Sequence, residues 1–178
     1  MSDVIALVFD FDDTLAPDST TGFLSGLGVD AGHFWSQEVG PLLSLHDWDP
    51  VPAYLYQMIE LSRSGRHGLI TQERLAQWGR RLPLHDGVDT LFSRLRALVK
   101  AQHPQVQIEF YLISSGIGDV VRNTPIAHEF TDIWASEFMY GQDGGIHFPR
   151  RIVSFTDKTR YLFHIQKGIV DVVRNTPI

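Results

Sequence analysis

The chain of 178 residues contains no cysteine, which excludes disulfide bonds and thiolate metal sites. It also has no long apolar run: the stretch VIALVF near the start is too short for a membrane span or a signal core, and it runs directly into acidic residues. Basic residues are scattered, and the formal net charge is -6. We therefore expect a cytoplasmic protein that binds neither membranes nor nucleic acid.

What the chain does contain is enough apolar material for a folded core. Hydrophobic residues make up 43% of the sequence and aromatic residues 11%. These values, together with the length, indicate a single globular domain, or one domain that carries an insertion.

The hydrophobic pattern predicts an alternation of strands and helices. Residues 4–9 form a continuous apolar run, typical of a strand covered on both faces, and residues 107–113 form a second strand that ends in Ser-Ser-Gly. A turn-forming QDGG lies between two short β-like runs and indicates a hairpin. The segment KTRYLFHIQKG predicts a final amphipathic helix.

Several helices are predicted between the two strands. Asp18 or Ser19, Asp30, Asp49 and Thr71 stand where N-cap residues are expected. The last of these helices, DGVDTLFSRLRALVKA, places five apolar side chains on one face, namely Val88, Leu91, Phe92, Leu95 and Leu98. This order predicts a parallel α/β core with a helical insertion after the first strand.

An acidic cluster follows the first predicted strand directly. In FDFDDTL, Asp10 and Asp12 are two residues apart, so in extended chain both side chains point to the same side. The carboxyl ends of parallel strands face the functional crevice of such a sheet. Two adjacent carboxylates repel each other unless a cation or a shared proton compensates, which suggests Mg²⁺ and acid–base chemistry. An acidic turn that caps the next helix is the alternative.

Two further residues fall at corresponding places. Ser114 ends the second predicted strand and brings a hydroxyl and backbone N–H groups to the same sheet edge, where they could hold phosphate oxygens. Lys158 opens the final helix, where the helix dipole disfavours a cation, so an anionic partner would explain it. Taken singly, Ser114 favours an ordinary helix start and Lys158 favours a solvated surface lysine.

In combination, the strand followed by DxDxT, the strand followed by serine and the lysine at a helix start resemble the haloacid dehalogenase (HAD) superfamily. The helical insertion resembles the C1 cap of its phosphoserine-phosphatase-like branch, and the hairpin before Lys158 is similar as well. The resemblance implies a HAD-like Rossmannoid α/β core formed by residues 1–15 and 83–178. Residues 16–82 would form the helical cap, called the cap segment below.

The resemblance also implies a mechanism. Asp10 would be the nucleophile that forms an aspartyl-phosphate, and Asp12 would protonate the leaving oxygen and then activate water. Mg²⁺ would bind the Asp10 carboxylate and the main-chain carbonyl of Asp12. Because a leaving halide needs no proton, the second carboxylate favours phosphate-ester hydrolysis over dehalogenation.

The other motif residues would bind the substrate. Ser114, with the N–H groups of Ser115 and Gly116, would hold a phosphoryl oxygen, Thr14 would fix the motif loop, and Lys158 would offset negative charge. A small phosphorylated metabolite is thus the expected ligand.

One family motif has no counterpart in this sequence. After Lys158 nothing matches the acidic GDGxxD-like segment that supplies the remaining metal ligand, and Asp171 lies in the wrong context. The chain is therefore expected to lack the C-terminal part of the core, as if truncated before this fourth motif. The absent strand would leave an edge of residues 4–9 unpaired, so we expect self-association there, or pairing with GIVDVVRN. The alternative function is an inactive HAD-like fragment that binds phosphate compounds or a protein partner.

The last eleven residues, GIVDVVRNTPI, repeat residues 116–126 with one substitution. A repeat architecture is excluded because the similarity stops at the edges of the copy and no third copy exists. A junction at Gly-Ile explains it, whether in a rearranged gene, by engineering or through an error in the recorded sequence.

Overall fold

A four-stranded sheet forms the centre of the computed structural model, which describes residues 3–168. Its strands are β1 (Val4–Phe9), β2 (Gln107–Ile117), β3 (Asp132–Tyr140) and β4 (Ile146–Arg151), in that spatial order. β1, β2 and β3 run parallel, whereas β4 is antiparallel to β3. The expected hairpin is therefore confirmed as β3 and β4.

The helical segments agree in order with the sequence pattern. Between β1 and β2 lie α1 (Ser19–Gly26), α2 (Ala31–His33), the π-helix Phe34–Val39, α3 (Gly40–His46), α4 (Pro50–Ser64), α5 (Gln72–Arg81) and α6 (Val88–Gln102). Further along are α7 (Gly118–Val121), the 3-10 turn Ala127–Glu129 and α8 (Lys158–Lys167). Among the described residues, no helix is both long and apolar enough to cross a membrane.

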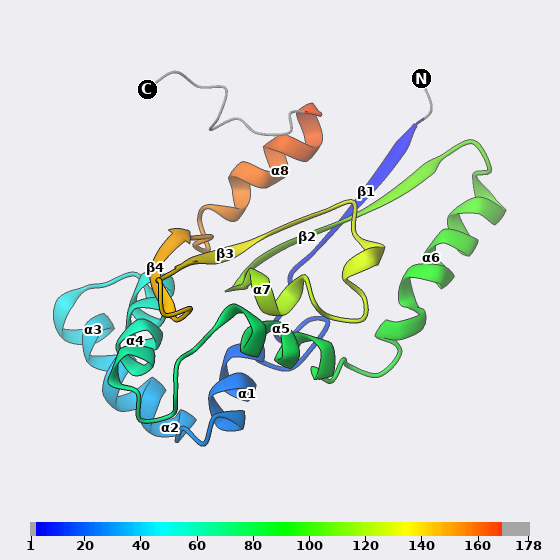
Figure 1. The fold of residues 1–178 in the computed structure, drawn as a ribbon. Coiled ribbons are helices and arrows are strands. Elements are labelled where there is room, and N and C mark those ends of the chain that lie inside the picture. Colours follow the sequence, from blue (N-terminus) through cyan, green and yellow to red (C-terminus); the bar gives the residue numbers. More distant parts are fainter. Residues whose placement is uncertain (1–2, 169–178) are drawn as a thin grey trace.

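Helices lie on both faces of the sheet (Figure 1). α8 lies on one face, and α6 and α7 lie on the other, while α1 to α4 gather beyond the carboxyl ends of β1 and β2. A large buried cluster joins the cap segment to the α6 side of the sheet, including Phe11, Leu24, Leu55 and Phe92. The fold is thus a layered α/β core with a helical insertion after β1, as predicted.

Capping chemistry explains where the helices of the cap segment begin. The carboxylates of Asp18, Asp30 and Asp49 each accept hydrogen bonds from backbone N–H groups in the first turn that follows. The Thr71 hydroxyl does the same for α5, accepting from the N–H of Arg74. α4 ends at Gly65, whose positive φ of 67° permits the left-handed C-cap.

On α6, Val88 and Phe92 are buried and Leu98 is 53% exposed. Two local expectations were wrong. The helix after Asp30 is divided by a π-helical stretch over Phe34–Val39. β2 does not end at residue 113 but continues through Ser114 to Ile117 with an irregular register, because this stretch still pairs with β3 at Ser136.

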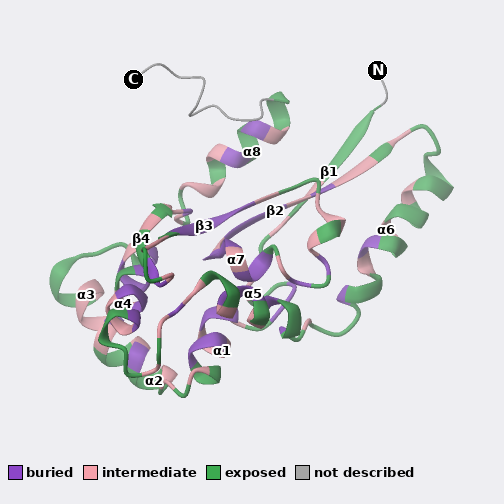
Figure 2. Ribbon diagram, viewed as in Figure 1, coloured by how far each residue is buried: buried purple, intermediate pink, exposed green. Residues whose placement is uncertain are grey.

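The expectation that β1 is covered on both faces was also wrong. β1 is the edge strand, and Val4, Ile5 and Val8 are 48%, 39% and 37% exposed. Its register with β2 places Val8 beside Tyr111, on the face where α8 lies, but α8 packs against the cluster around Trp134 and leaves β1 exposed (Figure 2). The expected unpaired edge is confirmed for the described residues. Pairing with GIVDVVRN concerns residues that, after Gly168, lie outside the described range.

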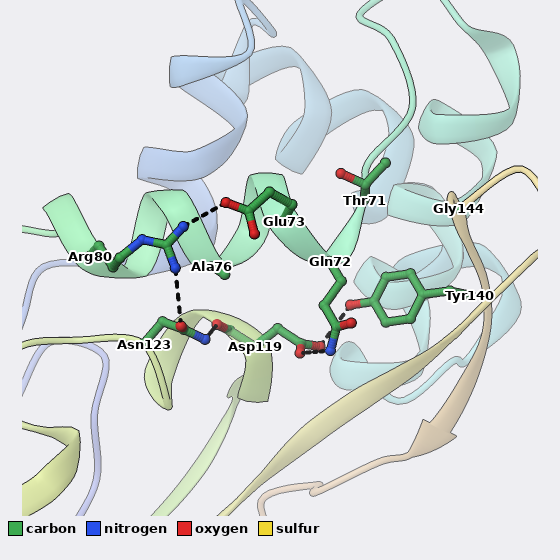
Figure 3. A pocket seen from close by; sticks show the side chains of 9 residues that line it. All are labelled: Thr71, Gln72, Glu73, Ala76, Arg80, Asp119, Asn123, Tyr140 and Gly144. Carbon is green, nitrogen blue, oxygen red and sulfur yellow. Dashed lines mark hydrogen bonds and ion pairs between the residues drawn. The ribbon is translucent and has the colours of Figure 1, made fainter.

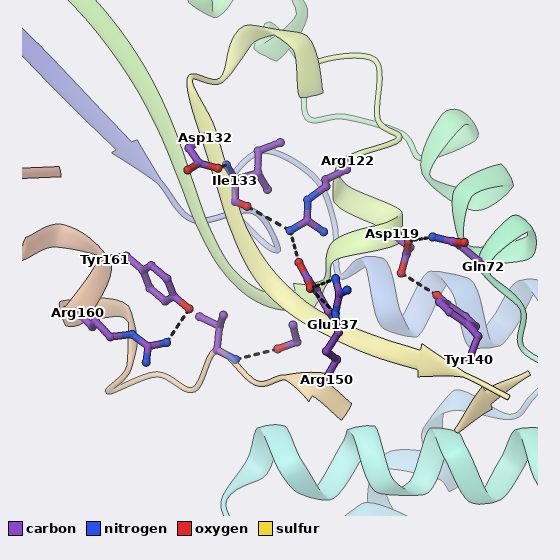
Figure 4. A network of polar contacts seen from close by, with 12 residues as sticks. Gln72, Asp119, Arg122, Asp132, Ile133, Glu137, Tyr140, Arg150, Arg160 and Tyr161 are labelled. Carbon is purple, nitrogen blue, oxygen red and sulfur yellow. Dashed lines mark hydrogen bonds and ion pairs between the residues drawn. The ribbon is translucent and has the colours of Figure 1, made fainter. Parts of the chain in front are cut away.

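A network of charges joins α7 to the hairpin (Figure 4). The Glu137 side chain is 9% exposed and forms ion pairs with Arg122 and Arg150. Burial alone would raise the pKa of Glu137, but the hydrogen bond from Arg150 and the charges of Arg122, Arg151 and Arg150 together lower it below its ordinary value. The carboxylate is therefore charged and paired in the folded state.

We expect Glu137→Gln to lower the free energy of unfolding by about 1–3 kcal/mol at pH 7, because two arginines lose their charged acceptor. A depressed pKa stabilises the fold above the ordinary carboxyl value of 4.5 and ceases to do so as pH falls through the lowered folded-state value. The difference between wild type and variant should therefore shrink in acid. Urea unfolding between pH 3 and pH 8 measures this, with Glu73→Gln, which breaks an exposed ion pair with Arg80, as the control. A difference that is constant with pH would contradict the interpretation.

The uncharged edge of β1 is self-complementary. A twofold axis at Ala6 would pair two copies antiparallel, with Val4 opposite Val8 and Ile5 opposite Leu7, so that only apolar side chains meet across the axis. Natural edge strands usually carry charges, prolines or bulges that prevent such pairing, and residues 4–9 contain no charge or proline.

We expect the solution mass of the protein to rise with concentration in sedimentation experiments. Ala6→Lys places two like charges opposite each other at the axis and should weaken association at least about tenfold. Ala6→Thr keeps an uncharged strand former and should retain it. A strict monomer at high concentration, or equal association of the two variants, would contradict this arrangement.

Candidate active site

The turn after β1 places the acidic cluster at the carboxyl end of the strand. The N–H groups of Thr14, Leu15 and Ala16 all lie within hydrogen-bonding distance of the carbonyl of Phe11, whose ring is fully buried. Asp13 adopts a positive φ of 57°, which turns the chain back towards the cap segment. Backbone contacts and one buried ring thus hold the loop, while Thr14 itself is exposed.

Asp10 meets the lysine of α8 across the site. Its Oδ1 accepts from the N–H of Phe11 at 2.8 Å, and its Oδ2 lies 2.5 Å from Lys158 Nζ. The two residues are 148 positions apart in the sequence. The anionic partner expected for Lys158 is therefore present, and it is the candidate nucleophile.

Asp12 lies deeper than Asp10. Its Oδ1 accepts from the N–H of Ser19 at 2.8 Å, which ties it to the start of α1. Burial raises the pKa of Asp12, outweighing the hydrogen bonds from Ser19 that lower it.

The irregular end of β2, residues 114–117, is called the β2 loop below, and at Gly116 it lies against the acidic motif. A Cβ atom at this position would lie 2.6 Å from Asp12 Oδ2 and 3.1 Å from Ser114 Oγ, so a side chain there would force the loop and the motif apart. Ser114 is fully buried, and its Oγ accepts from the N–H of Gly116 at 2.9 Å. That N–H was expected to face a ligand. In the structure it is engaged within the loop, because the two-residue spacing closes a local ring.

A clamp on the carbonyl of Ser115 was not foreseen from the sequence. Tyr54 of α4 donates its hydroxyl to this oxygen at 2.6 Å, and Ser136 of β3 donates to it at 3.0 Å. Tyr54 is almost fully buried, which raises its pKa, as do the nearby charges of Asp12 and Asp18. Only the polar end of Tyr54 on an otherwise apolar helix face could have signalled this contact.

The cap segment, the loop after β1 and the end of β2 line a cavity of about 350 Å³ that is partly open to solvent, called the motif cavity below. It is lined by Asp12, Asp13, Asp18, Thr20, Trp35, Val39, Leu43, Pro50, Val51, Tyr54, Ser115, Gly116 and Phe155. Among the predicted site residues, Asp12, Ser115 and Gly116 line it directly. Asp10 and Lys158 meet each other next to Asp12, and Ser114 lies behind Gly116.

A second cavity, of about 500 Å³, lies where α5 meets α7 (Figure 3). Its polar side chains already bind one another: Gln72 and Tyr140 donate to the two carboxylate oxygens of Asp119 at 2.9 and 2.7 Å. At this joint a Cβ on Gly79 would lie 2.2 Å from the carbonyl oxygen of Val120, so the two helices touch backbone to backbone. This cavity therefore lies in the contact by which the cap segment packs against the core.

The described residues contain no cluster of three or more side chains of the metal-ligating types His, Cys, Asp and Glu. Asp10 and Asp12 therefore remain the predicted metal ligands on this part of the chain. Asp171 and the second copy of the repeated sequence, apart from Gly168, lie outside the described residues.

Comparison with known proteins finds solved structures with a similar fold. A HAD-family hydrolase of Salmonella enterica serovar Typhi superposes with a TM-score of 0.68 at 13% identity, over 92% of this chain and 51% of its own. A phosphoserine phosphatase bearing an analogue of its phospho-aspartyl intermediate superposes with a TM-score of 0.65 at 14% identity, over 93% and 72%. The fold is that of the HAD hydrolases.

Sequence comparison is less informative. No family model matches the chain. An uncharacterised protein of Borreliella burgdorferi is 28% identical over 187 aligned positions, which cover 93% of this chain and 65% of the relative. The chain thus spans just under two thirds of that curated relative, and half of the Salmonella HAD hydrolase.

We expect Tyr54→Phe to lower the free energy of unfolding by about 0.5–1.5 kcal/mol, because the Ser115 carbonyl loses one of its two donors while the ring packing is kept. Urea unfolding measures the change. Tyr56→Phe, on the same helix but 40% exposed, is the matched control and should have little effect. Equal effects of the two variants would show that the clamp contributes nothing specific.

Proposed function

We propose that the protein is a phosphomonoester hydrolase that works through an aspartyl-phosphate. The observation that carries the proposal is the convergence of Asp10, Asp12 and Lys158 at one end of β1, in a fold shared with HAD phosphatases. The N–H of Phe11 donates to Oδ1 of Asp10 and Lys158 donates to Oδ2, so both oxygens of this carboxylate are held in a fixed orientation. The motif cavity beside it offers room for a small substrate.

In the proposed reaction an Asp10 oxygen attacks phosphorus and the ester oxygen leaves, taking a proton from Asp12. Water, deprotonated by Asp12, then attacks the aspartyl-phosphate, releasing phosphate and restoring both carboxyl groups. Lys158 offsets negative charge at the nucleophile and the phosphoryl group, which is the electrostatic part of the catalysis. Ser114 and the β2 loop would position a phosphoryl oxygen.

The oxygen donors present fit Mg²⁺. Asp10 offers a carboxylate and Asp12 a main-chain carbonyl, and Mg²⁺ is commonly held by one or two carboxylates with water and substrate phosphate completing its shell. When bound there, the ion would neutralise charge on the phosphoryl oxygens.

A second candidate is a HAD-like protein that binds phosphate compounds, or a protein partner, without turnover. The absence of a cluster of three or more metal-ligating side chains among the described residues favours it, because the Asp10 carboxylate would then be the one side-chain ligand assigned to the metal there. Its ligand would be the same small phosphorylated metabolite.

We expect the protein to release nitrophenol from p-nitrophenyl phosphate in the presence of Mg²⁺, and Asp10→Asn to abolish this by at least about a thousandfold because the nucleophile is lost. Asp89→Asn, an exposed change on α6, is the control and should retain full activity.

Stabilisation by inorganic phosphate in thermal unfolding, without hydrolysis at any Mg²⁺ concentration, would favour the second candidate. Hydrolysis that survives in Asp10→Asn would contradict the proposed nucleophile.

A further inference from the structure

The walls of the motif cavity differ in character from its floor. The floor is formed by Asp12 and the β2 loop, where the phosphoryl group would lie under the proposed function. The walls come from the cap segment and are mainly apolar or aromatic, and Phe155, 62% exposed, adds a further ring from the loop before α8. These walls face whatever part of a substrate lies beyond its phosphate.

The charge lining the motif cavity is entirely negative. Asp13 and Asp18 contribute carboxylates, Asp12 is the proposed proton donor, and no lysine or arginine occurs among the described residues that line the cavity. Lys158, the cationic side chain of the proposed mechanism, is already paired with Asp10 at 2.5 Å. A second anionic group on a substrate would therefore meet repulsion and no opposite charge.

The polar groups of the aromatic wall are also unavailable to an anion. The indole N–H of Trp35 donates to Thr21 Oγ1 at 2.7 Å, and the hydroxyl of Tyr54 donates to the Ser115 carbonyl at 2.6 Å. A carboxylate placed against this wall would lose water without gaining these donors, which is costly. The Ser115 hydroxyl oxygen is buried and has no hydrogen-bond partner among the described groups, so it too is not exposed to a group placed in the cavity.

The same wall suits a cation. Trp35 and Tyr54 pack edge to face with their ring centroids 5.8 Å apart, and both line the cavity near Asp18. Aromatic rings beside carboxylates attract ammonium groups through the ring quadrupole and through charge. At about 350 Å³ the cavity lies at the small end of ligand pockets, which favours an ester with a short alcohol part.

We propose that the motif cavity selects short phosphomonoesters whose alcohol part carries an ammonium group and no carboxylate, that is, aminoalkyl phosphates. This inference rests on the proposed phosphatase function and adds the substrate class. Asp18 and the rings of Trp35 and Tyr54 would receive the ammonium group, while the floor receives the phosphate.

The test compares three esters of similar size with the full chain and Mg²⁺: 2-aminoethyl phosphate, propyl phosphate and O-phosphoserine. The first pair differs by one positive charge, and phosphoserine adds a carboxylate to the amine. We expect kcat/KM for 2-aminoethyl phosphate to exceed that for each of the others by about tenfold. Equal values for the aminoethyl and propyl esters, or a preference for phosphoserine, would overturn the inference.

Asp18→Asn tests the residue assigned to the ammonium group. Asparagine is as good an N-cap as aspartate, so α1 should still form while the charge is lost. We expect the ratio of kcat/KM between the aminoethyl and propyl esters to fall about five- to tenfold. Asp30→Asn, the same change at the N-cap of α2 and outside the cavity lining, should leave that ratio unchanged. A ratio unaffected by Asp18→Asn would overturn the assignment.

Equilibrium binding of the same esters, measured by calorimetry, separates this inference from the proposed function. Hydrolysis of p-nitrophenyl phosphate with equal kcat/KM for the aminoethyl and propyl esters would overturn the proposed substrate class. It would still support the proposed phosphatase function. Tighter binding of the aminoethyl ester without any hydrolysis would support the selectivity of the cavity and contradict the proposed phosphatase activity. Absence of both hydrolysis and selective binding would overturn both.

Discussion

The parallel pairing of β1 with β2 is the constraint on which the candidate site depends. It aligns two strands that are separated by the whole cap segment, so that the loop after Phe9 meets the irregular end of β2 after Ile113. The absence of a Cβ at Gly116 then lets the β2 loop approach Asp12 closely. Without this register, the acidic motif and Ser114 would not share one site.

The cap segment takes part in the site through contacts that also hold the fold together. Tyr54 reaches from α4 to the Ser115 carbonyl, and Asp18 both caps α1 and lines the motif cavity. On the far side, the close approach of α5 to α7 at Gly79 attaches the cap segment to the core. The walls of the cavity are therefore positioned by the same interactions that position its floor.

Charge is distributed unevenly around this site. Lys158 is committed to Asp10, and Arg122 and Arg150 are committed to the buried Glu137 on the hairpin. The carboxylates of Asp13 and Asp18 line the cavity without a lysine or arginine beside them among the described lining residues. This local excess of negative charge, rather than the net charge of the whole chain, is the basis for expecting a cationic group in the part of the substrate beyond its phosphate.

Much of the local structure was determined by the sequence itself. Apolar runs, N-cap residues and the QDGG turn predict β1, most of the helices and the hairpin, because these features rest on contacts between neighbours along the chain. The motif residues also predict which side chains gather, since parallel strands end at one edge.

What only the tertiary structure decided depends on partners distant in sequence. The exposure of Val4 and Val8 follows from the position of β1 at the sheet edge, which an apolar run does not reveal. The clamp of Tyr54 and Ser136 on Ser115, the internal use of the Gly116 N–H and the aromatic wall at Trp35 follow from how the cap segment packs on the loops. Local pattern specifies elements and candidate chemistry, whereas packing between distant segments determines which groups remain free to act.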